Sequence, residues 1–252
     1  MQGLVEAALR TSSTEKKEAK PLEKADLKIT GVGAGGGGTN TVNRLSKMGI
    51  KSANTIAVNT DAKHLKLINA DKRLLIGGKM TKGLGAGGFP EVGMKCAEQG
   101  RERIAEILDG SELVFITAGM GGGTGTGAAP VIADVAKKQG AIVIGMVTYP
   151  FELERARLAK ADWGLDQMRE ACDTVVVIDN NRLVSYVPNL PMNKAFAVAD
   201  TLVARSIKGI TDTVMLPSLM NIDFADLRMI MGDAGVAMIS VGEGKGNNKV
   251  ED

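Results

Sequence analysis

The sequence predicts an α/β fold: a doubly wound, mostly parallel sheet flanked by helices, with a long helix following it. Apolar runs of strand character alternate with segments whose apolar residues recur at helical spacing, and glycine-rich loops follow several of the strand-like runs. The segments 141–148 and 174–178 are nearly uninterrupted runs of apolar and β-branched residues. Such runs are typical of central parallel strands that are covered on both faces.

The elements follow in a regular order from residue 27 onwards. Strands are expected at 27–32, 55–58, 73–76, 113–117, 141–148 and 174–178. Helices between them are expected at 39–49, 92–108, 128–138 and 152–171. The pattern then changes to a long helix at 192–210 that ends at Gly209, a shorter helix at 223–231 and a strand at 236–241.

Four parts of the chain follow from this order. They are an N-terminal arm or short helix (1–26), an α/β domain (27–191), a long helix with a loop and a following helix (192–235), and a final strand with a polar tail (236–252). The last part resembles the first strand and tail of a truncated second domain, with a natural mobile tail as the alternative. In a doubly wound domain the ligand crevice lies at the carboxyl ends of the strands. All three glycine-rich loops are expected at that edge.

Composition excludes several classes of protein. The chain has 252 residues, a formal net charge of +2, 44% hydrophobic and 24% charged residues. These values argue against a disordered chain and a basic nucleic-acid-binding domain, and no apolar run approaches the roughly 20 residues of a membrane helix. The first residues lack the basic region and apolar stretch of a signal peptide, so we expect none, and Cys96 and Cys172 lack metal spacing. We therefore expect a cytoplasmic protein with reduced thiols, without nucleic-acid partners or direct membrane insertion.

Glycine is the unusual component. Of 32 glycines, six lie in 31–38, four in 83–88 and six in 119–127. The third cluster stands between a predicted strand and a predicted helix, where successive backbone N–H groups, the helix N-terminus and the Thr124 and Thr126 hydroxyls suit a phosphate. Tight packing alone would need only one or two glycines, so we expect a phosphate cradle.

The first cluster leaves two interpretations open. Residues 31–36 satisfy G-x-G-x-x-G between a strand and a helix, which also suits a dinucleotide-binding oxidoreductase with Asp61 as its ribose acid. However, a dinucleotide needs one phosphate loop, whereas three loops that close on one crevice suit a triphosphate better. No glycine loop is followed by Lys-Ser or Lys-Thr, so a P-loop is excluded.

The segment 119–130 resembles the signature loop of the tubulin/FtsZ superfamily. Six further motifs occur in the family's order, at 57–61, 83–90, 150–151, 180–183, 195–196 and 221–226. The resemblance covers most of the chain, from about 27 to 242, and the first loop is more similar to archaeal members. It implies a GTP-binding, GTP-hydrolysing protein of the division cytoskeleton that assembles head to tail into filaments. In the parent protein it implies a location at the division site and possible cell-division adaptors.

The resemblance also assigns residues. It implies that the first and third loops hold the α- and β-phosphates, that Ala86 and Gly87 approach the γ-phosphate, and that Phe196 and Asp200 contact guanine. The implied nucleotide-binding set is Gly35, Gly36, Gly37, Asn40, Asn59, Asp61, Ala86, Gly87, Gly119, Gly121, Gly122, Gly123, Thr124, Gly125, Glu154, Asn180, Phe196 and Asp200. GTP or GDP would be the bound nucleotide, with Mg²⁺ held through the phosphates and without an assigned protein ligand.

Asp223 and Asp226 are the implied catalytic residues. From the residues alone the preferred explanation is favourable charges at a helix start, with Asp223 as its cap, and only the resemblance favours catalysis. In the family, acids at these positions project into the nucleotide site of the next subunit and polarise the attacking water. Phosphoryl transfer depends mainly on positioning and charge neutralisation, so such a split site makes hydrolysis depend on assembly.

Four features depart from the family. Leu158 stands where an arginine beside the ribose is usual, with Arg155 or Arg157 as possible substitutes, although Glu154 is the residue we assign. Asp179 replaces a proline, and Ser218 replaces a glycine. The family also continues into a second domain, so we expect this chain to be the nucleotide-binding part of a longer protein, with weak turnover. A non-catalytic nucleotide-binding subunit remains an alternative.

Overall fold

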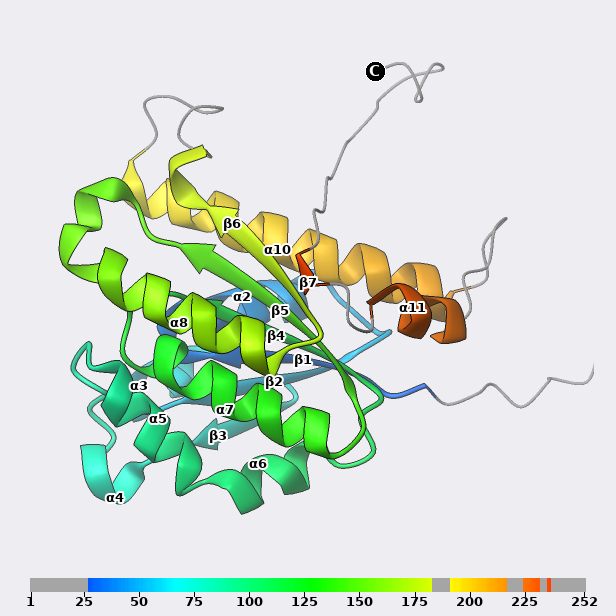
Figure 1. Ribbon diagram of the computed structural model, residues 1–252, viewed down its shortest axis with the longest axis horizontal. Coiled ribbons are helices and arrows are strands. Elements are labelled where there is room, and N and C mark those ends of the chain that lie inside the picture. Colours follow the sequence, from blue (N-terminus) through cyan, green and yellow to red (C-terminus); the bar gives the residue numbers. More distant parts are fainter. Residues whose placement is uncertain (1–26, 183–190, 217–223, 232–234, 237–252) are drawn as a thin grey trace, which may run out of the picture.

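The computed structural model describes residues 27–182, 191–216, 224–231 and 235–236 (Figure 1). Within them lies a seven-stranded sheet in the order β3-β2-β1-β4-β5-β6-β7, in which every neighbouring pair is parallel. The strands are β1 (Ile29–Ala34), β2 (Asn54–Asn59), β3 (Lys72–Leu75), β4 (Leu113–Gly119), β5 (Ile142–Tyr149), β6 (Thr174–Asp179) and β7 (Gly235–Val236). The predicted doubly wound α/β class is confirmed.

Helices cover both faces of the sheet (Figure 1). They are α2 (Gly35–Lys47), α3 (Ala62–Leu67), α4 (Gly78–Thr81), α5 (Pro90–Glu98), α6 (Arg101–Leu108), α7 (Thr124–Lys138), the 3₁₀ segment η1 (Glu152–Arg157), α8 (Leu158–Ala171), α10 (Met192–Met215) and α11 (Phe224–Met231). Among these residues no helix is both long enough and apolar enough to cross a membrane.

The strands alternate in which face they bury, as a pleated strand must. In β4, Val114 and Ile116 pack into the core under α5, α6, α7 and α8. Leu113 and Phe115 of the same strand pack into the core under α2, α10 and α11. Both faces of this central strand are therefore apolar, which explains its continuous hydrophobic run.

The single helix expected at 92–108 is wrong, because the structure breaks it into α5 and α6 at Gln99 and Gly100. The Gly100 N–H donates to the Ala97 carbonyl, and Gly100 occupies the N-cap position of α6. Glycine adopts this cap at little cost, whereas it is unfavourable inside a helix. The apolar periodicity continues across the break because Ala97 and Ile104 enter the same core.

The long helix does not end at Gly209, as the sequence predicted, but continues to Met215. Ile207 is fully buried and Ile210 packs against the same core. The Ser52 hydroxyl adds a hydrogen bond of 2.7 Å to the Asp212 carboxylate. These contacts outweigh the roughly 1 kcal/mol that one glycine costs inside a helix.

Other boundaries shift in ways that matter for the site. Helices α2 and α7 begin inside the glycine clusters, at Gly35 and Thr124, several residues earlier than expected. The helix expected at 152–171 starts as a 3₁₀ segment with a kink at Glu154 (φ −86°, ψ 38°). Helices α3 and α4 were not predicted. Beyond Gly235–Val236, the strand expected at 236–241 lies outside the described residues.

Candidate functional site

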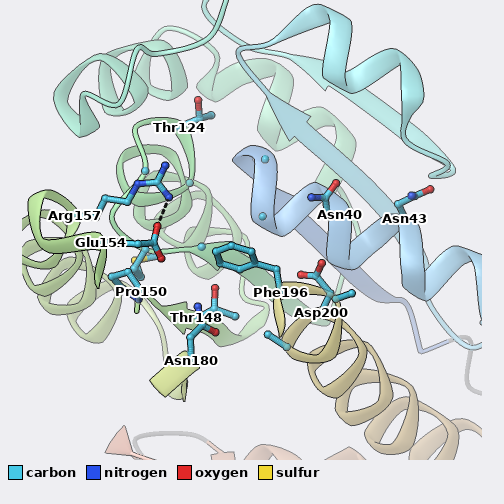
Figure 2. A pocket seen from close by; sticks show the side chains of 18 of the residues that line it. Asn40, Asn43, Thr124, Thr148, Pro150, Glu154, Arg157, Asn180, Phe196 and Asp200 are labelled. Carbon is cyan, nitrogen blue, oxygen red and sulfur yellow. Dashed lines mark hydrogen bonds and ion pairs between the residues drawn. The ribbon is translucent and has the colours of Figure 1, made fainter. Parts of the chain in front are cut away.

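A pocket of about 880 Å³ opens at the carboxyl ends of the strands. The sheet order reverses at β1, between β2 and β4, so α2 and α7 leave β1 and β4 side by side. Thirteen of the residues implied by the resemblance line this pocket: Gly36, Gly37, Asn40, Ala86, Gly119, Gly122, Gly123, Thr124, Gly125, Glu154, Asn180, Phe196 and Asp200. Figure 2 shows the side chains of the labelled ones around one cavity.

The three glycine loops pack directly against one another. Gly35 has φ +70°, and a Cβ there would stand 2.5 Å from the Gly125 backbone nitrogen. A Cβ on Gly123 would stand 2.9 Å from the Ala86 Cβ and 3.1 Å from the Gly88 nitrogen. Several glycines are therefore required by loop packing, more than the one or two expected from the sequence.

At two positions of the pocket, loop packing does not explain why the residue is glycine. Gly36 and Gly122 both line the pocket, and neither has a positive φ. A Cβ on Gly36 would meet nothing within 4 Å, and one on Gly122 would meet only the Gly119 carbonyl, at 3.9 Å. Open space in front of a bare backbone leaves room for close approach by a ligand.

The floor of the pocket suits an anion. The N-termini of α2 and α7 both lie at its edge, and each contributes backbone N–H groups without helical partners and the positive end of a dipole. Thr124 lies beside them, with its hydroxyl oxygen 2.6 Å from that of Thr60. If Thr60 donates in that pair, the Thr124 proton stays available to a ligand.

The other end of the pocket is lined by apolar and amide side chains, which come from α10 and from the residue that follows β6. Phe196 is 38% exposed and packs edge-on against Phe151, with ring centroids 5.2 Å apart. Asp200 lies one turn further along α10, so the two residues share a helix face. Asn180 is 2% exposed, and its Oδ1 has no hydrogen-bond partner. A buried acceptor of this kind needs a donor, which a ligand in the pocket can supply.

Burial raises the pKa of Asp200 above its usual range. A 3.0 Å hydrogen bond from the Thr41 hydroxyl to Oδ1, together with the positive charge of Arg44, acts in the opposite direction. The second carboxylate oxygen is left to accept from a ligand.

Arg157 is a pocket residue that we did not assign from the sequence. Its Nη1 donates to Glu154 Oε2 at 2.6 Å, and both residues line the pocket (Figure 2). The structure thus places Arg157, and not Arg155, beside the position where the family's arginine is replaced by Leu158. The turn depends on Gly121 (φ +89°), where a Cβ would stand 2.8 Å from the Arg157 Cβ.

Other pocket residues were also missed. They are Asn43, Arg44, Lys47, Met48, Gly88, Met120, Thr148, Pro150, Ala197 and Ala199. Asn40, Arg44 and Lys47 are spaced like one face of α2, so helical spacing counted from Gly36 and Gly37 was a signal that could have found them. Thr148 and Pro150 follow the rule that strand ends line the crevice.

Five implied residues do not line the pocket: Gly35, Asn59, Asp61, Gly87 and Gly121. Asp61 caps α3, since its carboxylate accepts from the backbone N–H groups of Lys63 and His64. Asn59 is buried, and its Oδ1 accepts from the N–H groups of Thr60 and Asp61. Gly87 has φ +61°, a conformation that favours glycine regardless of any ligand.

Of the two implied catalytic acids, the one that the structure describes, Asp226, lies away from this pocket. Asp223 is outside the described residues. Asp226 is exposed in the first turn of α11. The Arg228 guanidinium of α11 donates to the Gly140 carbonyl, just before β5, and the Thr174 hydroxyl at the start of β6 donates to the Met231 carbonyl. Helix α11 therefore lies at the amino ends of the strands, at the other edge of the sheet from the pocket (Figure 1).

Metal ligands are not gathered in the described part of the chain. No group of three or more His, Cys, Asp or Glu side chains stands there in a position to hold a metal ion. The pocket's own carboxylates, Glu154 and Asp200, come from different walls, and each is already hydrogen-bonded. Those residues fit a metal that takes its ligands mainly from a bound phosphate and from water.

Comparisons with known proteins agree with this arrangement. Cell division protein FtsZ 2 of Methanocaldococcus jannaschii is 57% identical over 240 residues, which are 95% of this chain and 63% of that protein. Cell division protein FtsZ 2 of Halobacterium salinarum is 50% identical over 256 residues, covering 100% of this chain and 65% of that protein. The chain thus spans less than two thirds of the length of these curated relatives.

A solved structure shows the same fold. An empty FtsZ dimer from M. jannaschii superimposes with a TM-score of 0.81 at 42% identity, covering 92% of this chain and 65% of that one. The family model described as "Tubulin/FtsZ family, GTPase domain" matches residues 28–188, the part that holds strands β1 to β6 and all three glycine loops. The chain belongs to the tubulin/FtsZ family.

Proposed function

We propose that this chain binds GTP and GDP in the pocket at the carboxyl edge of its sheet and hydrolyses GTP in head-to-tail filaments. The observation that carries the proposal is the open backbone at Gly36 and Gly122, which belong to two loops at the N-termini of α2 and α7. Backbone N–H groups and helix dipoles there suit the α- and β-phosphates. The second loop, with Ala86 and Gly88 on the pocket wall, is suited to sense the γ-phosphate.

Guanine is the base that the apolar end favours. The Asp200 carboxylate has one oxygen free to accept, and guanine presents two adjacent donors, N1–H and the exocyclic amine. Adenine offers no such pair, so its binding would leave the buried carboxylate unsatisfied. Phe196 supplies an aromatic contact, and Asn180 contributes a buried acceptor that lacks a protein donor. These groups support guanine over adenine and over nicotinamide dinucleotides.

The chemistry of hydrolysis divides between two copies of the chain. Within one copy, Arg157 and the loop N–H groups neutralise phosphate charge, and the pocket orients the triphosphate. Bound Mg²⁺ would supply further charge neutralisation through the phosphates. Asp226 lies at the opposite edge of its own sheet, where it can orient water only for a neighbour. We assign the same role to Asp223. The empty FtsZ dimer among the solved relatives supports self-association of this family.

A site shared between two subunits makes GTP hydrolysis depend on assembly. Because the acids come from a neighbouring subunit, turnover should be slow wherever assembly is weak. We further propose that residues 27–191 form the nucleotide-binding domain, that 192–235 carry the long helix and the acids, and that 236–252 begin a second domain. A location at the division site in the cytoplasm, and contacts with division adaptors, follow from the family as proposals.

Calorimetry with GDP, GTP, ATP and NAD tests the binding proposal. We expect GDP and GTP to bind, and ATP and NAD to bind at least about 100-fold more weakly, which corresponds to ~2.8 kcal/mol. Tight binding of NAD without binding of GTP would instead support the oxidoreductase. GTP binding without turnover under any assembly condition would support a non-catalytic subunit.

Mixing two defective variants tests the split site. Asp200→Asn should bind GTP only weakly but keeps its acids, whereas Asp226→Asn should bind GTP but supplies a weakened acid to its neighbour. Each alone should release phosphate slowly, and a mixture should be faster than the sum of the two. Asp166→Asn, at an exposed position of α8, is the matched control and should behave as the unmodified chain. A mixture that shows no recovery contradicts shared sites.

A further inference from the structure

The only histidine of the chain, His64, stands behind the pocket residue Asn40. His64 lies on α3, and its Nε2 is 3.2 Å from Asn40 Oδ1. Its Nδ1 is 3.3 Å from Asn59 Nδ2, on the other side of the ring. His64 does not line the pocket, whereas Asn40 does. The ring therefore bridges Asn59, the buried last residue of β2, to a residue at the pocket wall.

Backbone N–H groups determine the direction of the hydrogen bonds that connect Asn59, His64 and Asn40. Asn59 Oδ1 accepts from two backbone N–H groups, those of Thr60 at 2.8 Å and Asp61 at 3.2 Å. A backbone N–H can only donate, so the oxygen of the amide must face them and the NH₂ must face His64. The lone pair of His64 Nδ1 accepts that donor.

The histidine tautomer follows from this constraint. With Nδ1 as acceptor, the ring proton is on Nε2, which then donates to Asn40 Oδ1. The Thr39 hydroxyl, 3.3 Å from Nδ1, already donates to the Gly35 carbonyl at 2.7 Å, so towards the ring it offers only a lone pair. The Asn59 NH₂ can only donate, so Nδ1 keeps its lone pair for Asn59, and Thr39 makes no hydrogen bond to the ring in this tautomer. One oriented path runs from the backbone through Asn59 and His64 to Asn40.

The hydrogen bond from His64 Nε2 to Asn40 Oδ1 determines which end of the Asn40 amide faces a ligand. Because its oxygen is held by His64, its NH₂ is the end left for the pocket, and Figure 2 shows the nitrogen of Asn40 turned towards the cavity and the oxygen turned away. An amide free to flip would present either end and would hold a donor in place only part of the time. A phosphate or ribose oxygen needs a donor at this wall.

We propose that His64 is a positioning residue, which orients Asn40 so that its NH₂ donates to an oxygen of the nucleotide's ribose or phosphates. The inference rests on the proposed nucleotide site, but the hydrogen-bond path itself exists without ligand. His64 does not touch the ligand, so its whole effect should pass through Asn40. That requirement separates it from a residue with a merely structural role.

Nitrogen-15 NMR of the nucleotide-free chain tests the path directly. Because the sequence contains one histidine, its two ring nitrogens can be assigned without ambiguity. We expect a proton on Nε2 and none on Nδ1. A proton on Nδ1, or averaged signals from two tautomers, would overturn the proposal whatever the chain binds.

GDP binding to four variants tests the consequence. His64→Phe keeps the ring but removes both nitrogens and should weaken GDP binding about fivefold, the usual worth of one hydrogen bond. His64→Gln, which can accept and donate in the same sense, should restore most of the affinity. Leu67→Phe adds a similar ring on the exposed side of α3 and should leave affinity unchanged. Asn40→Ala should weaken binding at least as much as His64→Phe.

A double-mutant cycle gives the decisive comparison. If His64 acts through Asn40, then His64→Phe should have no further effect on GDP binding once Asn40→Ala is present. Additive losses would mean that His64 acts by another route and would overturn the proposal. If the unmodified chain binds no guanine nucleotide, the proposed function fails, whereas the NMR result still decides the hydrogen-bond path.

Discussion

Glu154 holds Arg157 at the pocket wall by using both of its carboxylate oxygens. Oε2 accepts from the Arg157 guanidinium at 2.6 Å, and Oε1 accepts from the Phe151 backbone N–H at 3.1 Å. The carboxylate is therefore fully engaged on the protein side. Arg157 keeps further N–H donors and is 57% exposed at its side chain. The pair thus presents a cation, not an acid, to whatever occupies the pocket.

Removing that cation should weaken nucleotide binding. Arg157→Ala is expected to lower GDP affinity about tenfold, since a charge-assisted hydrogen bond to an anion is worth ~1.5 kcal/mol. Arg155→Ala is the matched control, because Arg155 is exposed two residues away and does not line the pocket. Calorimetry with GDP measures both variants. Equal losses would mean that the effect comes from general charge and not from the position of Arg157.

Gly36→Ala should change stability and binding in opposite directions. Gly36 lies in the first turn of α2 with free space around its missing Cβ, so alanine should stabilise the fold by roughly 0.5 kcal/mol. The added methyl projects where the ligand approaches, and GDP affinity should fall by about tenfold, or ~1.4 kcal/mol. Thermal unfolding and calorimetry measure the two effects.

The matched control is Gly209→Ala, inside α10. A Cβ there also meets nothing within 4 Å, but Gly209 is not a pocket residue. Alanine should stabilise the helix by about 1 kcal/mol and leave GDP affinity unchanged. Unaltered binding by Gly36→Ala would show that its backbone does not approach a ligand.

Guanine binding should weaken on acidification at a higher pH than an ordinary aspartate would cause. Burial raises the pKa of Asp200, and only its ionised form accepts from guanine. Affinity should therefore fall as pH drops through the raised pKa, and binding should release protons. The stability of the nucleotide-free protein depends on pH in the opposite sense. The contribution of Asp200 to the free energy of unfolding is present at low pH and is lost as pH rises through the raised pKa of the folded state.

Thr41→Val provides the comparison for this pH dependence. It removes the hydrogen bond that lowers the Asp200 pKa, so the acidic loss of GDP affinity should move to higher pH. Asp200→Asn should bind GDP weakly and without that titration. Affinity measured across the acidic range, in buffers of constant ionic strength, checks both variants. A profile identical in Thr41→Val and the unmodified chain would contradict the role of this hydrogen bond.

Both thiols should be unreactive in the folded protein. Cys96 and Cys172 are free and buried, and burial raises the pKa of Cys172 to about 12. At pH 8 the thiolate fraction is then small and access is blocked. A chromogenic disulfide reagent should react with neither cysteine in native buffer and with both in denaturant. Rapid native reaction of either residue would indicate that its core opens easily.

Much of the fold was predictable because burial on both faces leaves a strong signal. The runs at β4, β5 and β6 are apolar at nearly every position, since alternate side chains enter two different cores. Element ends were less predictable. Gly100 ends a helix while Gly209 does not, and the difference lies in tertiary packing around Ile207 and Ile210 that no local pattern records.

Site residues that belong to a family motif could be predicted from the sequence. Residues whose position depends on the local backbone conformation could not. Phe196 and Asp200 were assigned through the family resemblance, and both line the pocket. Arg157 was missed because a 3₁₀ turn with a kink at Glu154 changes which side chains face inwards. Asn59 and Asp61 belong to a motif of the family, yet their oxygens accept hydrogen bonds from nearby backbone N–H groups, which spacing in the sequence does not reveal.

The mutual packing of the three glycine loops has an evolutionary consequence. Gly35 touches the backbone at Gly125, and Gly123 touches Ala86 and Gly88, so segments far apart along the chain meet within one contact distance. A methyl group gained in one loop must be accommodated by a backbone shift in another. Because the third loop touches both of the others, the three loops should diversify together, and grafting the third loop from a distant relative should succeed only when the first and second are transplanted with it.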